Sequence, residues 1–109
     1  DVTYVVRKLL GLRVFDNSDG KMDLSVIEVD GAVMVVSQFT LYGDARRGRR
    51  PSFDEAAPPK RARPLYDSVV EGIRGAGLKV VTGEFGAMMD VSLVNNGPVT
   101  LLLDSTKQF

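Results

Sequence analysis

An almost unbroken apolar run from Ala32 to Leu41 limits most strongly the folds that this chain can adopt. Its β-branched valines favour a strand, and apolar residues at both odd and even positions predict that both faces of this strand are buried. Downstream, apolar residues in the segment 61–76 recur at spacings of three and four, which is typical of a helix with one buried face. Leu78 to Thr82 then predicts another strand. A doubly buried strand beside an amphipathic helix predicts a sheet covered by helices.

The remaining segments extend this picture to an α/β fold of the α+β type. Residues 1–12 predict a first helix, with Asp1 at its N-cap position. Alternating apolar residues predict strands in three further segments, Ser25–Val29, Met88–Val94 and Val99–Leu103. We therefore expect a single domain over residues 1–109, with a curved, barrel-like sheet of about five strands flanked by two helices. Such a small sheet has exposed edges, which a second copy of the chain or a missing N-terminal segment would cover.

Prolines leave the start of the second helix open. Pro58 and Pro59 suit a first helical turn, where a missing N–H costs nothing. Pro64 predicts either a later start of the regular helix, near Arg61, or a kink.

The absence of histidine and cysteine narrows the chemistry of the chain. Ser-His-Asp and Cys-His machinery and the usual zinc sites all need one of these residues. Catalysis would therefore rest on carboxylates, hydroxyls, backbone amides, Lys or Arg, or the substrate itself, and we expect no cofactor or metal. Hydrophobic residues make up 44% of the chain and charged residues 26%, as in an ordinary globular protein, and no apolar run approaches the length of a membrane helix. The lack of cysteine fits a cytoplasmic location.

Positive charge is concentrated in residues 46–63, although the net charge of the chain is zero. This segment holds seven basic residues against two acidic ones, the basic residues being Arg46, Arg47, Arg49, Arg50, Lys60, Arg61 and Arg63. Such a local excess suits a phosphate backbone. A solvated, flexible loop explains the same composition equally well.

Polar side chains close the buried run at Ser37, Gln38 and Thr40. Either hydroxyl is a candidate nucleophile, but the chain has no histidine to activate it. Gln38 and the adjoining backbone N–H groups are alternatively suited to bind an oxyanion. A third interpretation is that these side chains satisfy backbone groups at a strand end.

Two later segments each allow a structural and a functional interpretation. Asn95–Pro98 has the composition of a turn, and its Gly97–Pro98 bond is a candidate cis peptide. The segment 82–87 is bounded by glycines that let a ligand approach the backbone. Phe85 and the pair Met88–Met89 would then line a ring pocket, or else pack as ordinary core.

Five motifs occur together along the chain, in the order VVSQFTLYGD, RRGRRPSF, AAPP, TGEFGAMMDV and VNNGPVTLLLDS. In this order they resemble the D-aminoacyl-tRNA deacylase family over nearly the whole chain. The resemblance implies a homodimeric hydrolase, active at its subunit interface without a cofactor. Its reaction would be cleavage of the ester between a D-amino acid and the terminal adenosine of tRNA. Glycine mischarged on tRNA for alanine is a second implied substrate. Asn96 stands where the family more often has Asp.

The resemblance also implies roles for individual residues. Ser37, Gln38 and Phe39 would lie at the aminoacyl group, with the main-chain N–H near Phe39 as an oxyanion donor and Thr40 as a rival nucleophile. The substrate's ribose 2′-hydroxyl would replace a side-chain base. The cis pair Gly97–Pro98 of a partner subunit would exclude L side chains. The region that would receive the terminal adenosine comprises Phe85, Gly86, Ala87 and Met89. The signature around Gly97–Pro98 also includes Asn95 and Thr100. From the local excess of positive charge, and not from the resemblance, the residues expected at tRNA phosphates are Arg46, Arg47, Arg49 and Arg50.

Family members usually carry N-terminal strands ahead of the first helix, and this chain starts at Asp1 without them. We therefore expect an N-terminally incomplete domain. The alternative to an active deacylase is a truncated, non-catalytic tRNA-binding module or an inactive fragment.

Overall fold

The computed structural model describes residues 1–109 as two helices and four short strands. Helix α1 spans Val2–Gly11 and helix α2 spans Pro59–Gly75. The strands are β1 (Phe15–Asp16), β2 (Met22–Leu24), β3 (Ala32–Val35) and β4 (Lys79–Thr82), and a 3₁₀ turn occupies Phe39–Tyr42. β1 pairs antiparallel with β2, and β3 pairs parallel with β4, so the chain has α+β architecture with two separate two-stranded sheets.

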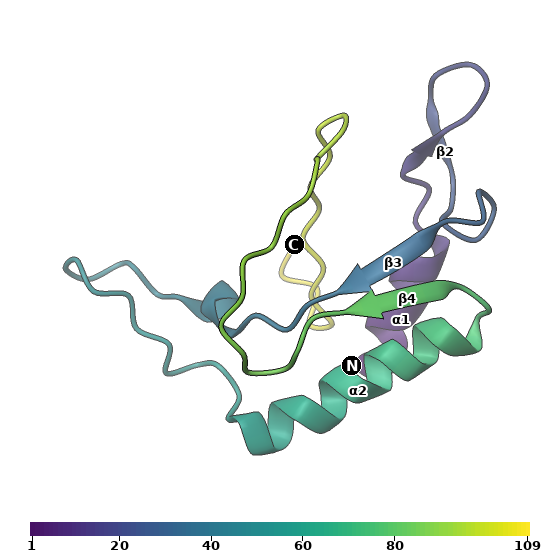
Figure 1. Cartoon of the computed structure of the whole chain (residues 1–109). Coiled ribbons are helices and arrows are strands. Elements are labelled where there is room, and N and C mark those ends of the chain that lie inside the picture. The colour runs from purple at the N-terminus through teal and green to yellow at the C-terminus, as the bar shows by residue number, and fades with distance from the viewer.

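Helix α2 covers one face of the β3–β4 pair, and α1 packs against α2 (Figure 1). Ile73 of α2 is fully buried and forms the core with Val26 and Leu78. The two helices approach closely at Gly72, where an added Cβ would lie 3.0 Å from a methyl group of Val6. The core is small, because only five of 109 residues are buried.

The expected curved, barrel-like sheet of about five strands is wrong. The segments Met88–Val94 and Val99–Leu103 are irregular, because no strand lies beside them to accept or donate backbone hydrogen bonds. The prediction that both faces of the strand starting at Ala32 are buried is wrong as well. Met34 is 57% exposed and Val81 of the neighbouring strand is 41% exposed, so helices cover one face of the β3–β4 pair only.

The segment Ser25–Val29 forms a turn, and its prediction as a strand is wrong. The backbone N–H of Ser25 donates to the Glu28 carboxylate at 3.0 Å, and the N–H of Glu28 donates to the Ser25 hydroxyl at 3.2 Å. This reciprocal exchange between residues three apart is a capping box, which favours a helical turn over a strand.

Both predicted helices are confirmed, with a correction at the start of α2. The helix begins at Pro59, ahead of Arg61, and contains Pro64 in its sixth position. Pro64 has no N–H to donate, so one backbone hydrogen bond is missing in the second turn. Its carbonyl accepts a hydrogen bond of 2.9 Å from the Ser68 hydroxyl.

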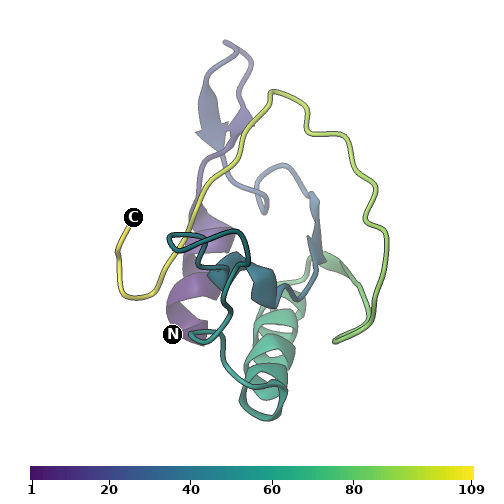
Figure 2. The same ribbon diagram turned by 90° about the vertical axis from the view of Figure 1, so that its left-hand side faces the viewer.

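Two long segments leave the helical body (Figures 1 and 2). The segment 43–58 extends as an arm between the 3₁₀ turn and α2. After β4 the chain runs in a wide arc and returns to α1, where the ammonium group of Lys107 lies 5.8 Å from the centre of the Tyr4 ring. Neither helix is long and apolar enough to cross a membrane.

Candidate active site

The parallel pairing of β3 with β4 brings two of the predicted site segments to one edge. Val35 lies opposite Thr82 at the carboxyl ends of the two strands. The N–H of Gly83 extends this pairing by donating to the Val35 carbonyl at 3.2 Å. Ser37–Thr40 and the segment 84–89 therefore leave the sheet side by side. The two segments are more than forty residues apart in sequence, and the chain between them includes the segment 43–58, α2 and β4.

The predicted catalytic segment changes direction at Gln38. Gln38 is extended, with φ −153° and ψ 100°, and the 3₁₀ turn starts at Phe39. The main-chain N–H groups of Ser37, Gln38 and Phe39 donate no hydrogen bond within the chain. Ser37 is half-buried and Phe39 is 60% exposed. The turn thus presents consecutive backbone donors at an accessible edge, which is what an oxyanion site requires.

Side chains around this turn hold one another. The amide of Gln38 donates to the hydroxyl of Thr40. The Phe39 ring meets the Phe53 ring edge to face, with centres 5.2 Å apart. No carboxylate or lysine hydrogen-bonds either hydroxyl of the segment, so neither Ser37 nor Thr40 has a base in contact.

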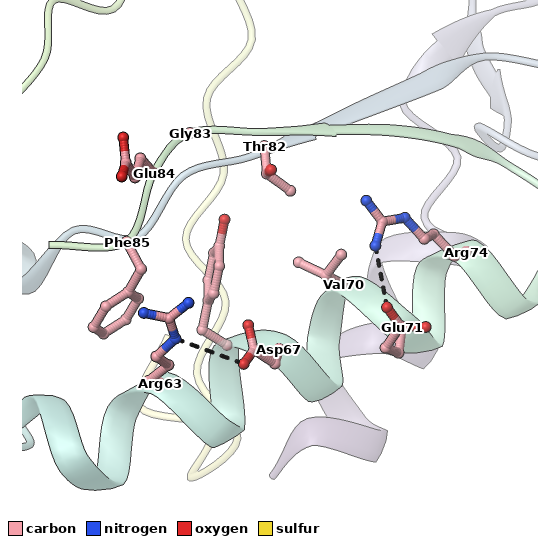
Figure 3. A pocket seen from close by; sticks show the side chains of 10 residues that line it. Arg63, Asp67, Val70, Glu71, Arg74, Thr82, Gly83, Glu84 and Phe85 are labelled. Carbon is pink, nitrogen blue, oxygen red and sulfur yellow. Dashed lines mark hydrogen bonds and ion pairs between the residues drawn. The ribbon is translucent and has the colours of Figure 1, made fainter. Parts of the chain in front are cut away.

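A cavity of about 470 Å³ opens between α2 and the end of β4 (Figure 3). At one end, the Arg63 guanidinium from α2 lies 5.6 Å from the centre of the Phe85 ring. The Tyr66 ring lies 5.6 Å from the same ring, tilted by 49°. Arg63 also pairs with Asp67 at 3.9 Å. The remaining lining residues are Val70, Glu71, Arg74, Thr82, Gly83 and Glu84.

The loop after β4 carries the residues predicted to receive the terminal adenosine. Gly86 adopts φ +76° and the N–H of Ala87 donates to the Glu84 carbonyl at 3.1 Å, which makes a tight turn. Phe85 projects from this turn into the cavity. Met89 packs on Gly83, where an added Cβ would lie 2.9 Å from its sulfur. The structure thus gathers Phe85 and Met89 at the edge that carries Ser37, with Gly86 and Ala87 in the intervening turn.

The predicted chirality loop is not part of this cluster. Asn95 closes the loop by accepting from the Val99 N–H at 3.1 Å and donating to the Thr100 hydroxyl at 3.3 Å. Gly97 adopts φ +134°, and the whole segment 91–100 is exposed. No hydrogen bond joins residues 95–100 to Ser37–Thr40 of the same chain. No peptide bond of the chain is cis, so the candidate cis bond at Gly97–Pro98 is trans in this structure.

Four predicted phosphate-binding arginines lie on the arm 43–58. A backbone bridge between Asp44 and Ser52 closes the base of the arm. Arg46 donates to both carboxylate oxygens of Asp44, at 2.9 and 2.7 Å, and these hydrogen bonds lower the pKa of Asp44 to about 2. Beyond this pair, three exposed arginines have no ion-pair partner: Arg47, Arg49 and Arg50.

Tyr66 joins the cavity to the strand end, and its place there did not emerge from the sequence. The hydroxyl of Tyr66 donates a 3.0 Å hydrogen bond to the Val35 carbonyl while its ring lines the cavity. In the sequence, Tyr66 is one of the residues of the segment 61–76 whose three-and-four spacing predicts a buried helix face. The signal was available, because a half-buried tyrosine hydroxyl needs a partner and few lie along a helix face.

Comparison with known proteins identifies the family. The model of the family described as D-Tyr-tRNA(Tyr) deacylase matches residues 1–104. The chain is 57% identical over 109 residues to the D-aminoacyl-tRNA deacylase of Thermosipho africanus and 60% identical to that of Thermotoga petrophila. Both alignments cover 100% of this chain and 73% of the relative. A solved structure described as c-Myc DNA Unwinding Element Binding Protein superposes with a TM-score of 0.85 and 38% identity, covering 96% of this chain and 72% of that one. The chain belongs to the D-Tyr-tRNA(Tyr) deacylase family of enzymes.

Proposed function

We propose that this chain hydrolyses the ester bond of D-aminoacyl-tRNA, releasing the free D-amino acid and tRNA. Glycine mischarged on tRNA for alanine is the second proposed substrate. The observation that carries the proposal is the shared edge at which the free N–H groups of residues 37–39 lie beside the Phe85 cavity. A donor surface next to a ring-sized cavity suits an ester whose alcohol is a nucleoside. Because its substrate is aminoacyl-tRNA, the proposed location is the cytoplasm.

The proposed chemistry uses the backbone and the substrate in place of a side-chain base. Water attacks the ester carbonyl carbon, and the negative charge that develops on its oxygen is bound by the main-chain N–H near Phe39. The bond to the ribose 3′-oxygen then breaks, and that oxygen takes the proton released by the water. The ribose 2′-hydroxyl is the proposed relay for this proton. Each preorganised donor of an oxyanion typically contributes about 10²- to 10³-fold in rate.

The proposed working unit is a homodimer. The chain exposes 8947 Å², whereas a folded monomer of its 11.9 kDa mass exposes about 5,900 Å². The difference, roughly 3,000 Å², exceeds a standard protein interface. Much of it lies in the C-terminal arc, where Met88 is 100% exposed, Val94 90% and Leu93 71%. We propose that a second copy covers this arc and receives its Gly97–Pro98 loop beside residues 37–39.

In that arrangement, chirality is read by exclusion. The loop 95–100 is closed by its own Asn95 hydrogen bonds, so it enters a partner as a preformed unit. The main chain at Gly97–Pro98 then occupies the space that an L side chain would need. Glycine has no side chain to exclude, which accounts for its acceptance. Specificity of this kind comes from a built-in clash and not from added attraction.

The arm 43–58 supports a tRNA partner. Arg47, Arg49 and Arg50 are exposed without acidic partners, and three guanidinium groups in four residues suit a phosphate backbone. The solved relative named for binding a DNA unwinding element also has a nucleic acid partner by its name. The same arm favours the second candidate function, a tRNA-binding module without catalysis.

Incubation with D-tyrosyl-tRNA and L-tyrosyl-tRNA separates the two functions. The deacylase proposal expects release of D-tyrosine and little release of L-tyrosine. Equal hydrolysis of both esters, or of neither, would contradict it. Salt-sensitive tRNA binding without any release would instead support the binding module.

A further inference from the structure

We infer that Tyr66 is a positioning residue that couples the nucleoside cavity to the oxyanion segment. This role rests on the proposed function, since it assigns the nucleoside of the substrate to the cavity. In this role Tyr66 does not itself touch the ester.

The first support is the hydrogen bond itself. Val35 is the last residue of β3, and its carbonyl accepts from both the Tyr66 hydroxyl, at 3.0 Å, and the Gly83 N–H, at 3.2 Å. This one oxygen therefore joins α2, β3 and the loop after β4. Ser37 follows two residues later, so a shift at Val35 passes directly to the N–H groups of residues 37–39.

The second support is the ring of the same side chain. Tyr66 lines the cavity and contacts Phe85, whose other neighbour is the Arg63 guanidinium. A planar base entering beside Phe85 would press on the Tyr66 ring, because the centres of the two rings are only 5.6 Å apart. The hydroxyl at the far end of that ring holds the strand end. Occupation of the cavity and placement of the oxyanion donors thus depend on one rigid side chain.

The third support is that no hydrogen bond fixes the backbone donors of residues 37–39. The main-chain N–H groups of Ser37, Gln38 and Phe39 donate no hydrogen bond within the chain, and β3 lacks a cover on its outer face at Met34. The side-chain contacts of this segment, Gln38 with Thr40 and Phe39 with Phe53, are both made on the far side of it from Val35 in sequence or with the exposed arm 43–58. An interaction that fixes Val35 therefore has a large share in placing the donors, and a misplacement of about 1 Å in a catalytic group can cost on the order of 100-fold in rate.

Steady-state kinetics of Tyr66→Phe test the inference. The substitution keeps the ring and removes the hydroxyl. We expect kcat on D-tyrosyl-tRNA to fall by roughly 10- to 100-fold while KM stays within about twofold. Tyr66→Leu, which removes the ring as well, should raise KM in addition. Tyr4→Phe makes the same chemical change on α1, at a hydroxyl without a hydrogen-bond partner in the chain, and should match the parent protein. An unchanged kcat in Tyr66→Phe, with the parent protein active, would overturn the inference and leave the proposed function intact.

A second measurement is independent of catalysis. Amide hydrogen exchange of the segment 36–40 is followed with and without adenosine 5′-monophosphate as the probe. We expect the nucleotide to slow exchange in the parent protein and in Tyr4→Phe, but much less in Tyr66→Phe. Equal protection in Tyr66→Phe and the parent, or no protection in the parent, would contradict the coupling even if no variant hydrolysed an ester.

Discussion

The Tyr66 hydroxyl donates to the carbonyl oxygen of Val35 across 3.0 Å, tying the middle of α2 to the last residue of β3. The two residues are 31 positions apart, so this bond forms only once the helix has packed on the sheet. It stands between the buried core on one side and the exposed donor segment on the other.

Ile73 carries a large part of the stability of this small core. It is the one fully buried large side chain, at 0% exposure. We expect Ile73→Ala to lower the free energy of unfolding by about 2 to 5 kcal/mol, because the substitution leaves a cavity that the few neighbours cannot fill. Urea denaturation followed by circular dichroism measures the change. Leu65→Ala, on the same helix at 44% exposure, should cost much less; a similar loss in both would show that burial at Ile73 is not the cause.

Gly83 makes room for Met89 beside the cavity. A Cβ at residue 83 would lie 2.9 Å from the Met89 sulfur, so Gly83→Ala must displace that flexible side chain. We expect KM for D-aminoacyl-tRNA to rise several-fold, with a small change in melting temperature because Met89 is already 40% exposed. Gly75→Ala is the control, since nothing lies within 4 Å of its added Cβ and alanine favours the helix. An unchanged KM in Gly83→Ala would show that Met89 does not help to bind the terminal adenosine.

Local patterns predicted the helices well. The three-and-four spacing of apolar residues in 61–76 anticipated α2 because a helix face is read from the chain itself. Leu78–Thr82 was likewise recognised, and β4 spans Lys79–Thr82. The prediction at Ser25–Val29 was wrong because it followed the alternation of apolar residues alone, whereas the Ser25–Glu28 capping box decides the structure.

Strands were harder to predict because their existence depends on partners that the local sequence does not name. Met88–Val94 alternates as a strand should, yet no strand of this chain pairs with it. The site residues differ in the same way: local motifs could be recognised, but their contacts with distant segments could not. The motifs at Ser37–Thr40 and Phe85–Met89 were recognised as segments, but their meeting at one edge depends on the parallel register of β3 with β4. Tyr66 was missed as a site residue because its partner, Val35, is distant in sequence.

The arm arginines should govern the salt dependence of tRNA binding. We expect the combined substitution of Arg47, Arg49 and Arg50 by alanine to weaken tRNA binding at low salt. The slope of log affinity against log salt should shrink by roughly 0.7 to 0.9 for each arginine that contacts a phosphate. Fluorescence anisotropy over a salt series measures this slope. Arg13→Ala removes an exposed arginine that pairs with Asp23 away from the arm and should leave the slope unchanged. The same slope in the triple variant and the parent would exclude the arm as a phosphate site.

Acid should break the Asp44–Arg46 pair in a defined pH window. The Arg46 hydrogen bonds lower the pKa of Asp44 from 3.8 to about 2. Because the folded value is the lower one, the stabilisation is present above pH 3.8 and is lost as the pH falls through about 2. A carbon-detected NMR titration of the Asp44 carboxyl checks this directly. Arg46→Ala should return its midpoint toward 3.8, and a midpoint already near 3.8 in the parent would refute the pair.

Thr40 as a nucleophile and the substrate's ribose 2′-hydroxyl as a proton relay lead to opposite predictions for the variant Thr40→Val. The Thr40 hydroxyl accepts a hydrogen bond from the Gln38 amide, and an amide N–H donor cannot take up the proton that a nucleophilic hydroxyl must release. We therefore expect Thr40→Val to keep activity within about tenfold of the parent, while a substrate with a 2′-deoxy terminal adenosine loses about 10²- to 10⁴-fold, the usual contribution of a positioned proton relay.

Single-turnover hydrolysis of D-tyrosyl-tRNA, with both terminal nucleosides and both proteins, measures all four combinations. Thr3→Val is the matched control, because Thr3 is an exposed threonine on α1. If Thr40 were the nucleophile, Thr40→Val would be inactive on either substrate and the 2′-deoxy ester would react normally with the parent. That pattern would show that the Thr40 hydroxyl, and not the ribose 2′-hydroxyl of the substrate, drives the reaction. It would also require a base for Thr40 from outside this chain, since no carboxylate or lysine of the chain hydrogen-bonds its hydroxyl.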